Sequence, residues 1–304
     1  MIFYLGIDIV EKIIRLKSYA KINLGLSVLA KRDNGYHDVD MIMQSLDLYD
    51  LITLKKNDAS EIRVFCNKEL NCKEENNAAY KAANKFFEYI GVNNFFIDIG
   101  IKKNIPICAG LAGGSSNAAA VLVGLNSMMG TNLDFDQLSQ IGKDIGADVP
   151  FCIFGGTMRA TGIGTDLKKI KNHLDYFVLL VKPKMSISTK DSYGRVNLCD
   201  IFHKESKIDN ILIGIEKNDV KFMAKNLFND LENSLLYIQK KEIDYIKEYM
   251  ISTGAINSCM SGSGPSVYGI FDDETTAIKC FESIKSKYEE SFLCKPVNYG
   301  VKIL

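Results

Sequence analysis

A stretch of glycine and other small residues, PICAGLAGGSSNAAA, occupies residues 106–120. It contains three glycines followed by two serines, Gly110, Gly113, Gly114, Ser115 and Ser116. Glycine adopts positive φ readily and lets a ligand approach the backbone closely. The serines open an alanine-rich segment typical of a helix, whose first N–H groups and dipole favour an anion. The stretch therefore predicts a binding site for a phosphate group.

The spacing of these glycines does not fit two common phosphate-binding motifs. A P-loop, GxxxxGK[ST], needs a lysine directly after its last glycine, whereas the next lysine after this stretch is Lys143. A dinucleotide-binding GxGxxG motif needs a different register of glycines. The remaining alternative is a tight turn between a strand and a helix with no ligand, although such a turn needs fewer glycines and serines.

The pattern P-x-x-x-G-L-x-x-G-S-S resembles the ATP loop of the GHMP kinases, the family of galactokinase, homoserine kinase and mevalonate kinase. These enzymes hold the triphosphate on backbone amides and a helix N-terminus. The resemblance implies that ATP is a substrate and that Mg²⁺ is carried with the nucleotide. It assigns ATP binding to Pro106, Ile107, Cys108, Ala109, Gly110, Leu111, Ala112, Gly113, Gly114, Ser115 and Ser116.

Asp148 lies in the segment GADVP, where Pro150 restricts the backbone and leaves the carboxylate free. An isolated aspartate of this kind is typical of a surface turn, and an isolated Lys21 would be a solvated lysine on a strand. Phosphoryl transfer to an alcohol, however, needs a group that orients the hydroxyl and accepts its proton, and a cation that offsets charge on the phosphoryl group. Beside the ATP loop, Asp148 suits the first role and Lys21 the second. An adjacent ammonium would also keep the carboxylate ionised.

Further segments narrow the resemblance within the family. AKINLGLSV, KRDNGYHDVDMIMQSLDLYD, IGADVPFCIFGGTMRATGIG and MSGSGPSVYGIF, in this order, are similar to the branch that acts on a cytidine diphosphate ester of methylerythritol. The similarity covers nearly the whole chain apart from its first residues, which match nothing assignable, and the stretch around residues 198–219. It implies transfer of the ATP γ-phosphate to the 2-hydroxyl of 4-diphosphocytidyl-2-C-methyl-D-erythritol, giving the 2-phosphate. This reaction belongs to the non-mevalonate (methylerythritol phosphate) pathway of isopentenyl diphosphate and isoprenoid biosynthesis.

A cytosine ring offers a π face for stacking and an edge of acceptors and a donor. By the resemblance, Tyr36 and Tyr193 enclose the cytosine and His37 reads its edge. Taken alone, Gly35-Tyr36-His37 is more typical of a turn with a buried aromatic. The substrate-binding set that the resemblance implies is Asn23, Tyr36, His37, Ala147, Thr189, Tyr193, Gly262 and Ser263.

A second stretch rich in glycine and serine, residues 260–266, is expected across the cleft near the phosphates; a plain loop before a strand is the alternative. Cys108 and Ala112 stand where the family often has glycine, and Tyr193 where it often has phenylalanine.

Another small-molecule GHMP kinase, of the homoserine or mevalonate type, should lack the cytosine residues. A non-catalytic, ligand-sensing relative should have lost the base or the phosphate loop, and the chain keeps both.

The elements that must position these residues follow from periodicity. Apolar residues alternate over residues 22–28, which predicts a strand with Lys21 and Asn23 on one face. Helices are predicted over residues 77–90, 116–129, 134–146, 220–236 and 242–251, and strands over 177–182 and 266–271. We expect an α+β chain, and the resemblance implies the two-domain GHMP kinase fold. Its expected parts are a ribosomal protein S5 domain 2-like domain over residues 1–165, which binds ATP and carries the catalytic residues, and a ferredoxin-like, substrate-binding domain over residues 166–304, with the active site in the cleft between them.

The 304 residues include 37 basic and 37 acidic side chains, so no overall field favours nucleic acid or a membrane surface. Asp8, Glu11 and Lys12 interrupt the apolar N-terminal segment, so we expect neither a signal peptide nor a membrane span, and a cytoplasmic location. The 8 cysteines form no CxxC pair and the 3 histidines are scattered, which predicts reduced thiols and no protein-held metal site. The expected partners are ATP and the cytidine diphosphate substrate, bound by a monomer or a weak homodimer.

Overall fold

The computed structural model describes residues 13–58, 61–69, 72–92, 95–198 and 204–304. The N-terminal segment, for which neither a signal peptide nor a membrane span is expected, lies outside these ranges. Among the described helices, none has both the length and the apolar character that crossing a membrane requires.

Strands and helices alternate along the described chain. The strands are β1 (Ile13–Lys31), β2 (His37–Lys56), β3 (Ile62–Cys66), β4 (Ile97–Lys102), β5 (Thr157–Thr161), β6 (Asp166–Ile170), β7 (Phe177–Val181), β8 (Phe228–Asn229), β9 (Asn257–Met260), β10 (Val267–Phe271), β11 (Ser291–Cys294), β12 (Pro296–Val297) and β13 (Val301–Ile303). The α-helices are α1 (Ala78–Tyr89), α2 (Gly113–Met129), α3 (Phe135–Lys143), α4 (Val149–Phe154), α5 (Thr189–Gly194), α6 (Lys204–Glu216), α7 (Val220–Lys225), α8 (Tyr237–Ser252) and α9 (Glu274–Ile284), and the 3₁₀ helices are η1 (Glu74–Asn76) and η3 (Asp230–Ser234).

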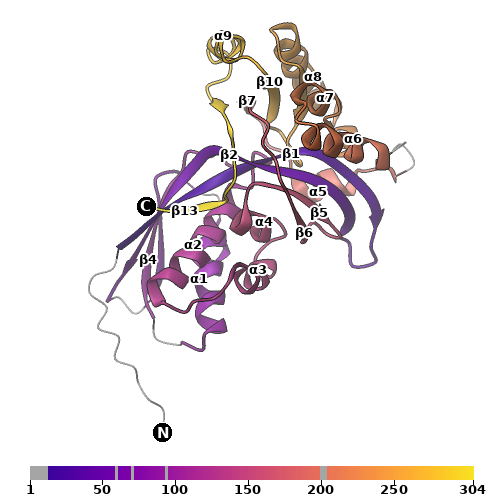
Figure 1. Cartoon of the computed structure of the whole chain (residues 1–304). Coiled ribbons are helices and arrows are strands. Elements are labelled where there is room, and N and C mark those ends of the chain that lie inside the picture. Colours follow the sequence, from indigo (N-terminus) through magenta and orange to yellow (C-terminus); the bar gives the residue numbers. More distant parts are fainter. Residues whose placement is uncertain (1–12, 59–60, 70–71, 93–94, 199–203) are drawn as a thin grey trace.

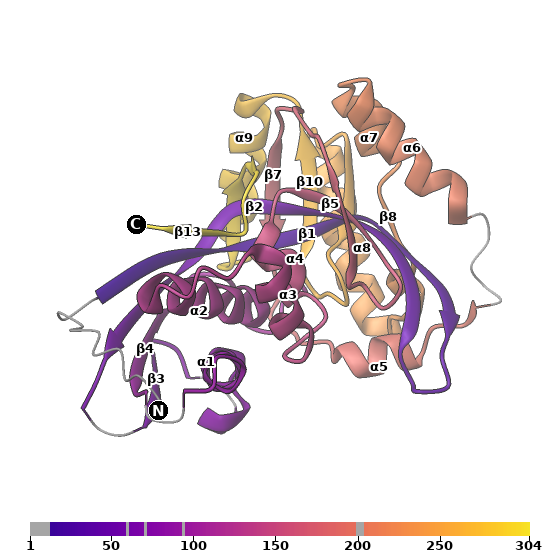
Figure 2. The same cartoon turned by 60° about the horizontal axis from the view of Figure 1, so that its bottom comes forward.

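Two sheets organise these elements. In the described part, the larger sheet follows the order β13-β1-β2-β4-β3, with β5 and β12 joined to β2, β6 to β5 and β8 to β1. The smaller sheet has the order β11-β7-β10-β9. Helices α1 to α4 lie on one side of the long β1–β2 ribbon, and α6 to α9 lie on the other side with β7 and β10 (Figures 1 and 2).

The expected strand over residues 22–28 is confirmed as part of the longer β1. Both of its faces are buried, so Lys21 and Asn23 are 4% and 0% exposed although they alternate with apolar residues. The pairing of β1 with β2 shifts register between Tyr19 and Lys21 and again between Asn23 and Gly25. Such bulges redirect side chains, and here they flank the two polar residues of the predicted site.

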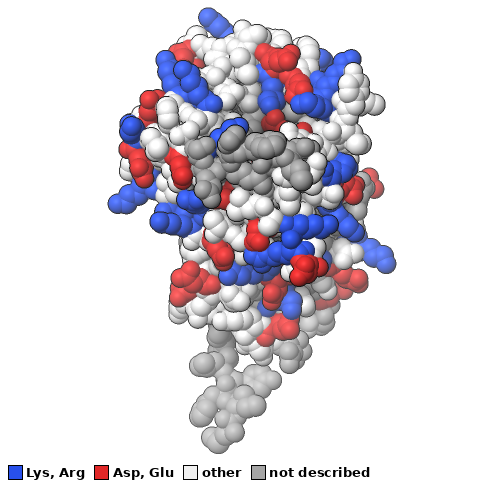
Figure 3. Space-filling view, turned by 90° about the vertical axis from the view of Figure 1, so that its right-hand side faces the viewer, with Lys and Arg blue, Asp and Glu red and all other residues white. Residues whose placement is uncertain are grey.

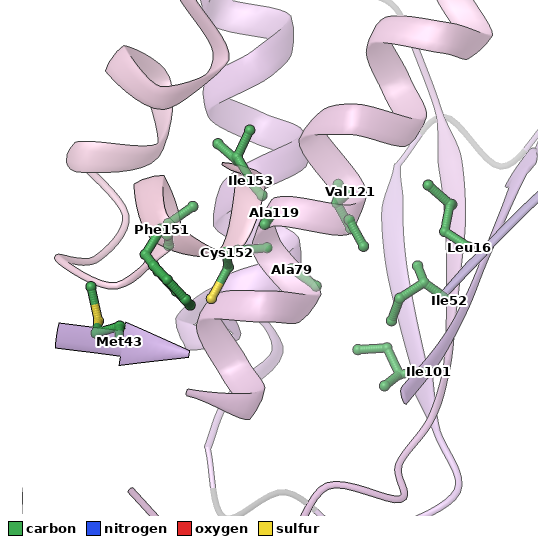
Figure 4. Packing of buried hydrophobic residues seen from close by; sticks show 14 of the residues in the cluster. Leu16, Met43, Ile52, Ala79, Ile101, Ala119, Val121, Phe151, Cys152 and Ile153 are labelled. Carbon is green, nitrogen blue, oxygen red and sulfur yellow. The ribbon is translucent and has the colours of Figure 1, made fainter. Parts of the chain in front are cut away.

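Helix α2 packs directly on the larger sheet. Figure 4 shows Val121 of α2 facing Leu16, Ile52 and Ile101, which come from β1, β2 and β4. A Cβ atom on Gly124 would lie 2.5 Å from Leu54 Cδ1, so this close approach depends on glycine. The packing fixes where the first turn of α2, and with it the predicted phosphate loop, meets the sheet.

Local capping explains most of the helix boundaries. Asn77 caps α1 by accepting from the N–H of Ala79, and Asp134 forms the predicted capping box with Gln137 at the start of α3. Gly130, at φ 63°, ends α2 as predicted. Helix α2 begins at Gly113, three residues before the predicted start, and α3 ends at Lys143, three residues before the predicted end.

The helix predicted over residues 220–236 is wrong in its second half. Helix α7 ends at Lys225, and the chain then forms β8 and η3. The strand β8 pairs in parallel with β1, where Leu26 is opposite Asn229. The Asn229 side chain accepts from the N–H of Leu231, which starts η3. Pairing with a distant strand thus replaces the local helical preference.

The last described strands return to the first sheet. Strand β12 pairs with β2, and β13 pairs with β1, after the chain has formed the second sheet. The hairpin of β5 and β6 also belongs to the larger sheet. The division into residues 1–165 and 166–304 stays a prediction.

Candidate active site

A cavity of about 1460 Å³ brings together nearly all residues predicted for the site. Its lining includes Lys21, Asp148, every loop residue from Pro106 to Ser115, and the residues Tyr36, His37, Ala147, Thr189, Tyr193, Gly262 and Ser263. Asn23 and Ser116 lie behind this lining. The Asn23 side chain accepts from Lys21, and the Ser116 hydroxyl donates to the carbonyl of Gly113.

Lys21 and Asp148 form an ion pair at the wall of the cavity. The Lys21 Nζ atom lies 3.6 Å from Asp148 Oδ2 and 2.7 Å from Asn23 Oδ1. The Lys21 side chain is 5% exposed and that of Asp148 33% exposed. Asp148 immediately precedes α4, where Pro150 stands in the first turn, but its carboxylate does not cap the helix. The carboxylate is therefore available to a reacting hydroxyl while its ammonium partner is held in place.

The loop before α2 takes backbone conformations that normally favour glycine. Gly110 has φ 73°, and Cys108 and Ala112 have φ 52° and 56°. The left-handed conformation of Cys108 and Ala112 is unfavourable for residues with a side chain. The loop of this chain therefore adopts these turns at some cost in backbone strain at Cys108 and Ala112.

The first turn of α2 presents a free set of N–H donors. The N-cap residue Ala112 makes no side-chain cap, and a Cβ atom on Gly114 would meet no described atom within 4 Å outside its chain neighbours and the helix's own backbone. Ser115 follows at the cavity wall. An uncapped N-terminus of a long helix, with open space above it, is suited to a phosphate group.

Lys103, at the same end of α2, was missed by the sequence analysis. Its Nζ lies 2.5 Å from Asp50 Oδ2 and 3.3 Å from Asn117 Oδ1, and Lys103 also lines the cavity. A Cβ atom on Gly113 would lie 2.9 Å from this ammonium. Lys103 stands only three residues before Pro106, but nothing in the sequence distinguishes it from its exposed neighbour Lys102.

Three aromatic side chains also line the cavity, those of Tyr36, His37 and Tyr193. The rings of His37 and Tyr193 have centroids 5.3 Å apart and planes tilted by 36°. Tyr36, in the turn between β1 and β2, is 57% exposed, and Gly35 before it has φ 84°. The cavity thus has a pair of a buried His37 and a half-buried Tyr193, and one exposed aromatic side chain, that of Tyr36.

Burial shifts the pKa values of both His37 and Tyr193. Desolvation, and to a smaller extent the charge of Lys31, lowers the pKa of His37 below its ordinary value. A neutral imidazole can donate one hydrogen bond and accept another, as reading a base edge requires. Burial, together with the charge of Asp148, raises the pKa of the Tyr193 hydroxyl, which stays protonated.

The stretch over residues 260–266 contacts the phosphate loop. The hydroxyl of Ser261 donates to the carbonyl of Gly110 at 3.0 Å, and a Cβ atom on Gly110 would clash with the carbonyl oxygen of Ser261. The hydroxyls of Ser263 and Thr189 are 2.9 Å apart, which joins this loop to α5. Asn229 donates to the carbonyl oxygens of Met260 and Gly262, both at 2.8 Å. Hydrogen bonds to the phosphate loop, to α5 and to Asn229 therefore fix the position of this loop.

No group of three or more His, Cys, Asp or Glu side chains that could hold a metal ion occurs in the described ranges. Basic and acidic side chains are interspersed over the face shown in Figure 3, as the balanced charge of the sequence suggests. A charged ligand would therefore be attracted by the charged side chains at the cavity and not by a net charge of the whole protein.

Two family models match the chain. The GHMP kinases N terminal domain matches residues 77–156, which include the phosphate loop and Asp148, and the GHMP kinases C terminal domain matches residues 211–290. The first match ends directly before β5, and the second spans α8, β9, β10 and α9. The matches define the class as GHMP kinases and confirm the two-domain α+β fold.

Curated relatives indicate the branch of the GHMP kinases to which this chain is similar. A protein of Clostridium beijerinckii named 4-diphosphocytidyl-2-C-methyl-D-erythritol kinase is 44% identical over 284 residues, 93% of this chain and 100% of the relative. A protein of the same name from Clostridium perfringens is 41% identical over 288 residues, 93% of this chain and 98% of the relative. The chain belongs to the GHMP kinase family, in the branch of the 4-diphosphocytidyl-2-C-methyl-D-erythritol kinases.

Solved structures agree with this placement. A crystal structure of 4-(cytidine 5'-diphospho)-2C-methyl-D-erythritol kinase is similar with a TM-score of 0.78 and 26% identity, covering 93% of this chain and 98% of that one. A homoserine kinase from Cytophaga hutchinsonii has a TM-score of 0.77 at 16% identity, with full coverage of both chains. The second likeness shows the fold alone.

Proposed function

We propose that this kinase transfers the γ-phosphate of ATP to the 2-hydroxyl of 4-diphosphocytidyl-2-C-methyl-D-erythritol, giving the 2-phosphate in the non-mevalonate route to isoprenoids. One observation carries the proposal. A single cavity contains the Lys21–Asp148 ion pair, the uncapped first turn of α2 and the ring pair of His37 and Tyr193. A phosphate donor and a cytidine-bearing acceptor could therefore meet at one acid–base pair.

In the proposed reaction, Asp148 orients the 2-hydroxyl and accepts its proton. The hydroxyl oxygen forms a bond to the γ-phosphorus, the bond from that phosphorus to the bridging oxygen breaks, and ADP leaves. Lys21 offsets negative charge on the transferring phosphoryl group, and Asn23 holds the Lys21 ammonium in position through their 2.7 Å contact. Positioning and charge stabilisation are the main demands of phosphoryl transfer.

The two substrates would occupy opposite ends of the cavity. The loop from Pro106 to Ser115 and the first turn of α2 would hold the phosphates of ATP. Tyr36 and Tyr193 would stack on the cytosine, and His37 would read its edge. Ala147, Thr189, Gly262 and Ser263 would contact the remainder of the acceptor; these lie in the same cavity lining.

The residues present fit a Mg²⁺ ion that arrives with the nucleotide. Within the described lining, the acidic side chains are Glu69 and Asp148, and Mg²⁺ often binds substrate phosphates with few protein ligands. Ser115, at the first turn of α2, would supply one oxygen. When bound, the ion would neutralise charge on the β- and γ-phosphates.

The same proposal includes the organisation of the protein. Residues 1–165 would form the ATP-binding and catalytic domain and residues 166–304 the substrate-binding domain. We place the reaction in the cytoplasm, where ATP is supplied, and expect a monomer or a weak homodimer that needs no nucleic acid or membrane.

An assay of ADP release tests the function. The purified chain is given ATP and Mg²⁺ with the cytidine diphosphate substrate, mevalonate, homoserine or galactose, and an Asp148→Asn variant serves as the inactive control. We expect turnover only with the cytidine diphosphate substrate. Turnover with one of the other alcohols instead would favour another small-molecule kinase of the family, and ATP binding without any turnover would favour a ligand-sensing protein.

A further inference from the structure

The charge of the cavity lining is unbalanced. Lys21, Lys31, Lys103 and Lys190 line it, against the carboxylates of Glu69 and Asp148 among the described residues. Lys21 is paired with Asp148, and Lys103 is paired with Asp50 behind the wall. In contrast, Lys31 and Lys190 make no ion pair, side-chain hydrogen bond or cation–π contact with any described residue. Two ammonium groups are therefore left for a ligand.

Lys31 lies beside the predicted cytosine site. It is the last residue of β1, and its partner across the β1–β2 hairpin is His37. At this distance its charge contributes, after desolvation, to lowering the pKa of His37. The Lys31 side chain is exposed, so its long stem can bring the charge toward a ligand at the mouth of the cavity.

Lys190 approaches the same region from α5. It follows Thr189 and precedes Tyr193 by three positions, so Lys190 and Tyr193 are neighbours on the surface of the helix. Thr189 in turn contacts Ser263 at 2.9 Å. Lys190 thus lines the cavity from the helix that carries Tyr193 and whose first residue contacts the loop over residues 260–266.

The proposed site for the phosphates of ATP has donors of its own. Lys103 Nζ lies against the first turn of α2, 2.9 Å from the place of a Cβ atom on Gly113, and Lys21 is paired with Asp148. Two unpaired cations beside the cytosine site consequently have no part in holding the nucleotide.

We propose that Lys31 and Lys190 bind the diphosphate that joins cytidine to the sugar alcohol, one from the β1–β2 hairpin and one from α5. The inference rests on the proposed function and extends it to what selects the acceptor. A diphosphate diester carries two negative charges, which two ammonium groups at this place would balance. Mevalonate, homoserine and galactose have no such group, so the pair would favour a nucleoside diphosphate ester over them.

Charge-removing variants test the pair. Lys31→Met and Lys190→Met should each raise the KM for the cytidine diphosphate substrate by about three- to tenfold, and the double variant by about the product. The values of kcat and of the KM for ATP should stay unchanged, and the substrate KM of the double variant should depend less on salt. Lys31→Arg, which keeps the charge, should restore most of the affinity. Lys184→Met is the matched control, because Lys184 pairs with Glu289 outside the lining.

Inhibition by cytidine and by CDP separates this inference from the proposed function. The unmodified protein should bind CDP more tightly than cytidine, and the double variant should lose that preference while its affinity for cytidine is unchanged. Equal CDP preference in both proteins, or a loss of kcat without a change in substrate KM, would overturn the role of the two lysines. If neither compound inhibits the unmodified protein, the cytidine site itself is wrong and the proposed function fails.

Discussion

Lys103 and Asp50 form an ion pair that is almost fully excluded from water, with side chains 4% and 0% exposed. The second oxygen of Asp50 accepts from the N–H groups of Asn104 and Ile105, at 2.7 and 2.8 Å. The ammonium is thereby fixed below Gly113, where the first turn of α2 begins. A positive charge is in place at the phosphate loop before any nucleotide arrives.

Lys103→Met should destabilise the protein, because it leaves the Asp50 charge buried without its partner. We expect a loss of about 3 to 5 kcal/mol in the free energy of unfolding, measured by chemical denaturation. Lys103→Met should also weaken ATP binding, because it removes the ammonium at the first turn of α2. Adding Asp50→Asn should recover much of the stability but not the ATP affinity, which isothermal titration would measure. Unchanged stability in the single variant would mean that the pair is not needed in the folded state.

Gly114→Val should weaken ATP binding without unfolding the protein. The added side chain would occupy the open space above the first turn of α2, while no described atom outside its chain neighbours and the helix's own backbone lies within 4 Å of its Cβ. We expect ATP affinity to fall at least about tenfold and the free energy of unfolding to change by about 1 kcal/mol or less. Gly113→Val is the comparison, since its Cβ would meet Lys103 at 2.9 Å and should lower both quantities. Normal calorimetric affinity in Gly114→Val would remove this turn from the ATP site.

Asp148→Asn and Lys21→Met should each lower kcat by at least about a hundredfold. Asparagine keeps the shape of Asp148 but cannot accept the proton, and methionine removes the ammonium. ATP should still bind both variants, because its expected contacts are on the loop and α2. As the two groups lie 3.6 Å apart, the double variant should lose less than the product of the single losses. Near-normal kcat in Asp148→Asn would exclude it as the base, and full multiplicativity would show that the pair is uncoupled.

The substrate KM should respond to the protonation of His37. Because burial lowers the pKa of His37, its neutral form persists below about pH 6.5, the ordinary value for histidine, and is lost only as the pH falls through the lowered pKa. Protonation removes the acceptor nitrogen, so the KM for the cytidine diphosphate substrate should rise at acid pH. In His37→Gln the KM should be higher throughout and nearly independent of pH between about 5 and 8. The measurement is the substrate KM as a function of pH, at saturating ATP, for the unmodified protein and for His37→Gln. The same pH dependence in both proteins would refute the role of His37.

The parts of the site that are local in sequence could be predicted, and those that depend on distant contacts could not. The alternation over residues 22–28 placed Lys21 and Asn23 on one face, and the glycines of the phosphate loop indicated the start of α2 to within three residues. The partner of Lys103 is 53 positions away, and no local pattern indicates that pairing.

The error over residues 220–236 has a similar cause. Helical preference favoured one continuous helix there, but Asn229 pairs with β1 and holds the carbonyl oxygens of Met260 and Gly262. These contacts exist only once two other parts of the chain have folded, and they override the local preference.

The pairing of β13 with β1 affects how the protein folds during its synthesis. Ile303 is the partner of Leu16, and Val301 that of Ser18. The ribosome makes Leu16 before almost all of the other described residues and Ile303 after almost all of them. Where β1 pairs with β13, its edge therefore stays unpaired through most of the synthesis of the described residues. An unpaired strand edge can associate with other chains. Closing a loop of this length also makes the final pairing slow.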